Sequence, residues 1–139
     1  MMTCIRFSVP GEPVGKARPR FTKNGHAYTP DKTRSYEAIV KLCVIKAMKG
    51  KKLLTGAISL SVTAFFPIPK SYTKAVREKA LSGEMRHTKK PDWDNVGKIV
   101  SDALNGVVYA DDAKVSHAIV DKRYSDFPRV EVAVELCGE

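Results

Sequence analysis

The chain has 139 residues, of which 43% are hydrophobic and 28% are charged, and its formal net charge at pH 7 is +9. This size and composition predict a single globular domain over residues 1–139. No apolar run approaches the ~20 residues of a membrane span, and the N-terminus lacks the apolar core of a signal peptide, so we expect a cytoplasmic protein. Three widely separated cysteines form neither a CxxC pair nor a disulfide framework.

The charge is divided unevenly along the chain. Residues 1–90 contain 19 Lys/Arg and 5 Asp/Glu, a net charge of +14, whereas residues 91–139 contain 5 and 10, a net charge of −5. This asymmetry predicts a basic surface that faces a polyanion and an acidic half that holds a cation. The alternative interpretation is that many of the lysines lie on solvated helix surfaces.

The N-terminal region begins with a predicted strand over residues 5–9, because apolar and polar residues alternate there. Lys16, Arg18 and Arg20 follow at a spacing of two, and Pro19 keeps the segment extended, so the three cations are expected on one side. Such a row suits contacts with the phosphates of a nucleic acid. A charged edge strand is the alternative.

The middle of the chain contains four predicted elements. They are a hairpin over 20–29 around Asn24-Gly25, a helix over 33–50 capped by Thr33, a strand over 58–66, and a helix over 73–81. The apolar residues of the first helix recur at helical spacing and are expected in the core; they are Tyr36, Ile39, Val40, Cys43, Val44 and Ala47.

Residues 83–90 are polar and basic and have no periodicity, which predicts a flexible loop. Arg86, Lys89 and Lys90 are placed in it to contact a nucleic acid beside the acidic stretch that follows. An ordinary surface loop is the alternative interpretation.

The most informative stretch is PDWDNVGKIVSDALNGVVYADDAKV, residues 91–115. It holds five of the fifteen acids of the chain, which are Asp92, Asp94, Asp102, Asp111 and Asp112. So many carboxylates within a basic protein favour a bound cation, and carboxylate oxygens are the donors that Mg²⁺ prefers. Each acid alone could instead be a helix cap or a turn residue.

The same stretch has a predicted geometry. Pro91 favours an extended entry, in which Asp92 and Asp94 point the same way and Trp93 points toward the core or an interface. Asp94 is the predicted N-cap of a helix that ends at Asn105-Gly106. The following loop delivers Asp111 and Asp112, so a third aspartate could return to meet the first two.

The C-terminal region contains two predicted strands, over 115–120 and 129–136, which we expect to form a hairpin through Asp126-Phe127-Pro128. Strands and helices are mixed without regular βαβ alternation, which predicts an α+β fold with a mixed sheet. No P-loop or GxGxxG motif is present, so no nucleotide cofactor is expected. The three histidines lack ligand spacing, which disfavours zinc.

Several motifs of the chain together resemble the signature of the RusA family of Holliday-junction resolvases. They are PDWDN with Lys98, DALNG, and YADD before Lys114-Val115. KARPRF, with Tyr28-Thr29-Pro30 behind it, is similar to the N-terminal half of the family. The resemblance covers most of the chain. It implies a small homodimeric endonuclease, often encoded by phages and prophages, that uses Mg²⁺, with Mn²⁺ as a possible substitute, and resolves four-way junction DNA by paired symmetric nicks.

Position by position, the resemblance makes Asp92, Asp94 and Asp112 the catalytic, metal-binding carboxylates and Lys98 the essential lysine. Asp111 and Asp102 match further acidic positions of the pattern, Asp111 as an additional metal ligand and Asp102 without an assigned role. From the residues alone, Lys98 could equally form an i, i+4 ion pair on its helix. Two other functions stay open: a metal nuclease for other branched DNA or for RNA, and a junction-binding module without catalysis.

Overall fold

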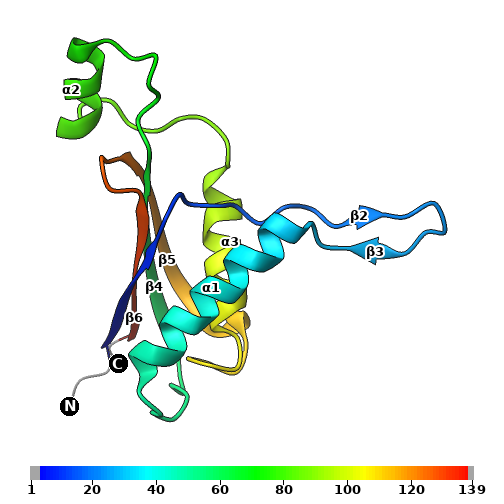
Figure 1. The fold of residues 1–139 in the computed structure, drawn as a ribbon. Helices are drawn as coiled ribbons and strands as arrows, with labels where there is room; N and C mark the ends of the chain where they lie inside the picture. The colour runs from blue at the N-terminus through cyan, green and yellow to red at the C-terminus, as the bar shows by residue number, and fades with distance from the viewer. Residues whose placement is uncertain (1–3, 138–139) are drawn as a thin grey trace.

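The computed structural model describes residues 4–137, and its strands and helices form a small α+β domain, as predicted (Figure 1). The elements in chain order are β1 (Cys4–Pro10), β2 (Arg20–Phe21), β3 (Ala27–Tyr28), α1 (Asp31–Met48), β4 (Ile58–Phe66), α2 (Lys74–Ser82), α3 (Trp93–Leu104), the 3₁₀ helix η1 (Asp112–Lys114), β5 (Val115–Tyr124) and β6 (Arg129–Leu136). The bounds of β4 coincide with the predicted strand.

The main sheet has the strand order β1-β6-β4-β5. β4 pairs in parallel with β5 and antiparallel with β6, and β6 also pairs antiparallel with β1. The predicted β5–β6 hairpin is therefore wrong, because β4 lies between the two strands. The turn residues after β5 reverse the chain, but alternation within a strand indicates only which face is buried, not which strand is its neighbour.

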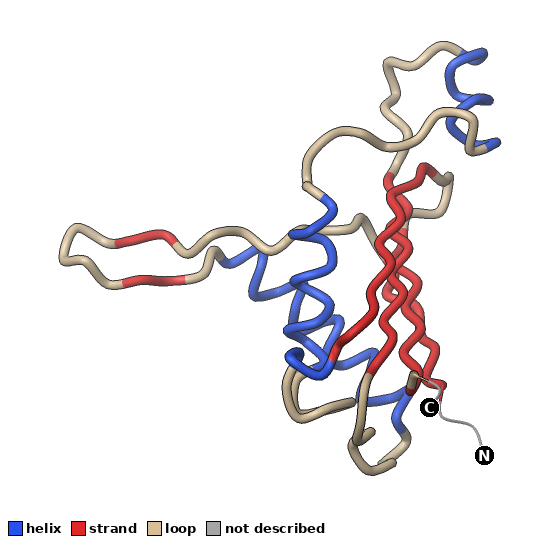
Figure 2. Tube along the Cα trace, turned by 180° about the vertical axis from the view of Figure 1, so that it is seen from behind, coloured by secondary structure: helices blue, strands red, loops and turns tan. Residues whose placement is uncertain are grey.

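One face of the sheet carries the core. α1 and α3 lie on the same side of the sheet in both views (Figures 1 and 2). Alternate residues of β4 point into this layer and are buried, from Ile58 to Phe66. The opposite face presents polar residues such as Arg6, Thr63 and Glu131, which is the usual arrangement for a sheet covered on one side.

α1 begins at Asp31, so the predicted capping role of Thr33 is wrong. The Thr33 side chain is buried, and its hydroxyl accepts a hydrogen bond of 3.3 Å from the backbone N–H of Ala17. Tyr36 and Val40 are in the core as predicted, whereas Ile39 is 44% exposed. The buried apolar residues of α1 recur every four positions from Tyr36 to Met48, and Ile39 lies outside this row, on the exposed surface of the helix.

The hairpin around residues 24–25 forms as predicted, with shorter strands, and projects from the body as an arm (Figures 1 and 2). The backbone N–H of Thr22 donates to the carbonyl oxygen of His26 at 2.9 Å and closes its end. Phe21 is 70% exposed on the arm.

Among residues 4–137, none of the helices is both long and apolar enough to cross a bilayer.

Candidate functional site

The first two aspartates lie at the start of α3. Asp92 is the N-cap residue, with extended backbone, and the helix begins at Trp93, so Asp94 is already in the first helical turn. The predicted extended run and the predicted cap at Asp94 are therefore wrong. Pro91 restricts the residue before it, not those after it. Asp94 accepts a hydrogen bond of 3.0 Å from the backbone N–H of Asn95, and an acidic side chain is favourable at this end of a helix.

Trp93 is 66% exposed, so of its two predicted places the core is wrong, and the interface stays a prediction. In an extended strand it would point away from the two aspartates, but in the first turn of a helix neighbouring residues spread around the axis. Its indole therefore lies on the surface beside Asp94, and both residues line the same two depressions.

The second pair of aspartates returns along α3 as predicted. The helix ends at Leu104 before Asn105-Gly106, and the buried Tyr109 donates a hydrogen bond of 2.9 Å from its hydroxyl to the carbonyl oxygen of Ser101. This bond fixes the returning loop against the helix. Asp111 then caps η1 by accepting from the N–H of Ala113 at 3.0 Å.

Asp94 and Asp112 line one depression of about 240 Å³ between α3 and β5, together with Trp93 and Lys98. Asp92 lies in an adjoining depression of about 800 Å³ that also includes Asp94. The structure thus brings Asp94 and Asp112 to one place and Asp92 beside it. Within residues 4–137, however, no three His, Cys, Asp or Glu side chains are grouped closely enough to hold a metal ion.

Lysine ammonium groups contact two of these three carboxylates. The ammonium of Lys90 donates to both oxygens of Asp92, at 2.9 and 3.1 Å. That of Lys98 donates to Asp112 at 3.3 Å. Asp94 has no ion pair with a residue in the described range 4–137. The carboxylate oxygens are donors that suit Mg²⁺. Lysine ammonium groups already contact two of the three carboxylates.

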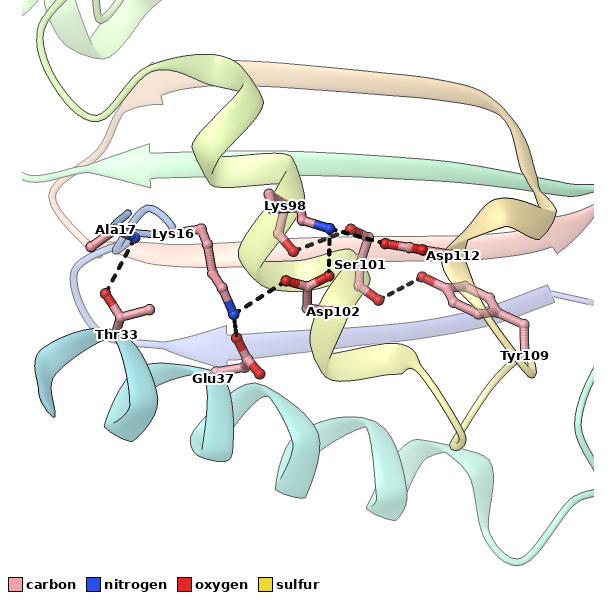
Figure 3. A network of polar contacts seen from close by, with 9 residues as sticks. All are labelled: Lys16, Ala17, Thr33, Glu37, Lys98, Ser101, Asp102, Tyr109 and Asp112. Carbon is pink, nitrogen blue, oxygen red and sulfur yellow. Dashed lines mark hydrogen bonds and ion pairs between the residues drawn. The ribbon is translucent and has the colours of Figure 1, made fainter. Parts of the chain in front are cut away.

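An ion-pair network extends from Lys98, which lines the depression, to Lys16 and Glu37 (Figure 3). Asp102 accepts from Lys98 at 2.9 Å and from Lys16 at 3.2 Å, and Lys16 also pairs with Glu37 of α1. The Asp102 side chain is only 17% exposed. Burial acts to raise the pKa of Asp102, but the hydrogen bonds from Lys98 and Lys16 outweigh it, and the pKa lies below its usual value. Asp102 therefore stays ionised, and Lys16 joins it to Glu37 of α1.

The network corrects the interpretation of the N-terminal cations. Lys16 already has two carboxylate partners, Glu37 and Asp102, whereas the sequence predicted a phosphate contact for it. Arg18 and Arg20 remain exposed.

The loop before α3 is held in place, whereas the sequence predicted a flexible segment. The ring of His87 is buried and stacks on Phe66 with 3.8 Å between the ring centroids. The ammonium of Lys122 donates to the carbonyl oxygen of Lys89 at 2.6 Å. Burial, with the charges of Lys122 and Lys89, lowers the pKa of His87 to about 4.

The three predicted nucleic-acid contacts of this loop have different surroundings. Arg86 pairs with Asp121 at 3.2 Å, and Lys90 holds Asp92. The ammonium of Lys89 lies 5.4 Å from the ring centroid of Tyr72. All three side chains are on the surface, and those of Lys89 and Lys90 line the depression that contains Asp92.

Sequence reasoning did not find Glu37 or His87. Glu37 had a usable signal, because it is an isolated acid beyond the first turn of a helix with several lysines. His87 had none, since its sequence neighbours are polar and its burial depends on Phe66 in a distant strand.

Comparison with known proteins agrees with the motifs of the sequence. The family described as "Endodeoxyribonuclease RusA" matches residues 10–135. A protein of Bacillus subtilis (strain 168) named "Uncharacterized protein YqaN" is 43% identical over 138 residues, which cover 96% of each chain. The family match spans both the arm and the carboxylate site, and this confirms the resemblance. The chain belongs to the RusA family of endodeoxyribonucleases.

Proposed function

We propose that this protein is a Mg²⁺-dependent endodeoxyribonuclease that resolves four-way DNA junctions by paired symmetric nicks. Membership of an endodeoxyribonuclease family supports the reaction class. The observation that carries the proposal is the depression lined by Asp94, Lys98 and Asp112, with Asp92 in the adjoining one. Acidic oxygens and an ammonium group thus line one accessible surface, and metal-dependent phosphodiester hydrolysis can use both.

In this proposal Asp92, Asp94 and Asp112 would hold the metal, which requires their carboxylates to come closer together than they lie within residues 4–137. Asp111 would be a further acidic ligand, and Mn²⁺ could substitute for Mg²⁺. When bound, the metal supplies an activated water and neutralises charge that develops on the phosphate. Lys98 contacts both Asp112 and Asp102. Its ammonium is thereby fixed beside the carboxylates, where it stabilises the negative charge of the transition state.

DNA binding is assigned to cations near the carboxylates. Arg18 and Arg20 are exposed at the base of the arm, and Lys89 and Lys90 lie on the loop before α3. Contacts of this kind address phosphates rather than base edges. The affinity for junctions is therefore expected to fall steeply as the salt concentration rises, because each phosphate contact releases counterions.

We further propose that the active form is a homodimer. A four-way junction has two equivalent strands to cut, which a two-fold pair of active sites matches. Exposed apolar side chains on the outer surface of α1 support self-association: Ile39 is 44%, Leu42 63% and Ile45 49% exposed. Sedimentation analysis tests this, with Leu42→Glu expected to give a monomer and the neighbouring Lys41→Glu expected to remain a dimer.

The deciding experiment is cleavage of a synthetic mobile four-way junction by the purified protein, with Mg²⁺ and with EDTA. Paired nicks that yield religatable duplexes only with Mg²⁺ are the expected result. A preference for flap DNA or RNA would keep the metal chemistry and overturn the substrate. Tight junction binding without any cut would instead indicate a binding module.

A further inference from the structure

We propose that a second site, beside the carboxylates, binds an unpaired nucleotide of a DNA strand. The site is a cleft of about 770 Å³ between the segment 12–20, the chain that follows β4, and the loop 87–91. Its volume lies in the range of ~300–1,000 Å³ found for sites that take small organic ligands. None of the proposed metal ligands lines this cleft, and neither does Lys98.

The lining of the cleft combines an apolar floor with a cationic rim. The floor includes Phe66, Ile68 and Tyr124 with several proline rings; those of Pro13, Pro67, Pro69 and Pro91 line it. The rim carries five cations, Arg20, Lys32, Lys70, Lys89 and Lys90, against the single carboxylate of Glu12. The occupant should therefore have both an apolar flat part and negative charge.

An unpaired nucleotide has both properties. In a duplex the flat faces of the bases are stacked inside, and only base edges, sugars and phosphates face a protein surface, so a duplex would leave the apolar floor unused. In a single strand the base is free to pack on the floor while its phosphates face the rim. Proteins that bind single strands combine a positive groove with apolar or aromatic platforms in this way.

One wall of the cleft is fixed by a close approach of two segments. The backbone N–H of Lys16 donates to the carbonyl oxygen of Asn95 at 2.8 Å. Gly15 permits this contact, because a Cβ atom there would lie only 2.6 Å from the Cβ of Pro91. The segment that forms this wall is thus held directly against the start of α3.

The opposite wall is fixed by the stack of His87 on Phe66 and by the bond from Lys122 to the backbone of Lys89. Contacts within the protein hold both walls, so the shape of the cleft does not depend on the bound nucleotide. Pre-organisation of this kind lowers the entropy loss on binding.

The position of the cleft relates it to the proposed cut. His87, Lys89 and Lys90 line both the cleft and the depression that contains Asp92 and Asp94. A strand whose phosphate reaches these carboxylates continues into the cleft, so the bound nucleotide is one that neighbours the scissile phosphate. This position rests on the proposed function, whereas single-strand binding by the cleft does not.

Charge reversal at the rim tests the site. Lys32→Glu/Lys70→Glu changes two exposed cations that form no ion pair within residues 4–137. Lys51→Glu/Lys52→Glu is the matched control; these exposed lysines follow the far end of α1, which starts beside the cleft (Figure 1). The measurement is fluorescence anisotropy with a short labelled single strand, and with a duplex of equal length, in EDTA.

The rim variant should bind the single strand about tenfold or more weakly than wild type, with a smaller change for the duplex, and the control should keep wild-type single-strand affinity. Equal losses in the two double variants, or wild-type single-strand binding by the rim variant, would overturn the proposal. Photo-crosslinking then locates the strand: a junction with 5-iodouracil next to the branch point should label the peptides of the cleft lining.

Junction cleavage with Mg²⁺ is measured on the same preparations, so the two proposals fail separately. Cleft-dependent single-strand binding by a wild-type protein that cuts no junction would refute the proposed function and leave the cleft assigned. Junction cleavage by wild type, together with unchanged single-strand affinity in the rim variant, would refute the cleft and leave the function standing.

Discussion

Two aspartates of α3 illustrate how surroundings decide what a carboxylate can do. Asp102 has a side chain that is only 17% exposed and is shared by Lys16 and Lys98. Asp94, two turns earlier on the same helix, is exposed and accepts a hydrogen bond from the N–H of Asn95. The first carboxylate already has its cations and supports the structure. The second has no ion pair with a residue in the range 4–137, and in the proposed function it is a metal ligand.

The largest expected effect tests the exposed member of the pair. Asp94→Asn keeps the shape of the side chain but removes the negative charge that a metal ligand needs, so junction cleavage should fall by about 10³-fold or more while junction binding is retained. Asp92→Asn should behave in the same way. Asp126→Asn, in the exposed turn after β5, is the control and should remain active. Full activity of either active-site variant would refute the metal assignment.

A smaller effect is expected at the residue that joins the two regions. Lys98→Met removes the ammonium that contacts both Asp102 and Asp112. The rate of cleavage under single-turnover conditions should fall by about 10²-fold, because a fixed positive charge is lost from the transition state. Lys114→Met, at an exposed lysine of η1, should cleave as wild type does. If the two methionine variants cleave at the same rate, Lys98 has only a structural role.

In contrast to the partnered Asp102, His87 is a buried titratable group whose Nδ1 atom has no hydrogen-bond partner within residues 4–137. Its pKa falls from 6.5 to about 4, chiefly through burial. Between these two pH values the unfolded chain binds a proton that the folded protein excludes, so stability is full above pH 6.5 and declines toward pH 4. The loss should be on the order of 2 kcal/mol.

Urea unfolding at pH 7 and near pH 4.5 measures this difference. His87→Phe preserves the stack on Phe66 but cannot take up a proton, so its stability should depend less on pH over this range. His117→Phe replaces an exposed histidine and serves as the matched control. An unchanged pH dependence in His87→Phe would show that the burial of His87 does not control acid stability.

The smallest effect is expected at the partnered carboxylate. Asp102→Asn should lower the free energy of unfolding at pH 7 by about 1 kcal/mol, because two lysines lose a charged partner. Hydrogen bonds from those lysines lower the pKa of Asp102 despite its burial. Its contribution is thus present above the unfolded value of 3.8 and disappears as the pH falls through the lower folded value. Urea unfolding at pH 7 and pH 3 checks this, and a difference of equal size at both would contradict the role assigned to the charge.

Local patterns predicted the elements of this fold well. Three features depend only on neighbours within a few residues. They are the alternating burial along β4, the row of buried residues on α3, and the end of α3 before Asn105-Gly106. They could be read directly from the sequence for that reason.

Pairings between distant segments could not be predicted. The position of β6 beside β4 depends on which strands compete for the same edge, and the orientation of Lys16 depends on Glu37 and Asp102, which lie 21 or more residues away. The sequence alone identified the four aspartates of the candidate site. It did not reveal that Lys90 contacts Asp92 or that Lys98 contacts Asp112, because these contacts depend on the backbone conformation and on the return of a distant segment.

The place of β6 in the sheet has a consequence for how the molecule forms. β6, which follows the other strands in the sequence, pairs with β1 on one side and β4 on the other. While the chain is being synthesised, β1 and β4 therefore cannot form these pairings until residues 129–136 have left the ribosome. Such non-local pairing slows folding and leaves strand edges open in the interval. A chain truncated before Arg129 would keep both edges exposed and is expected to aggregate.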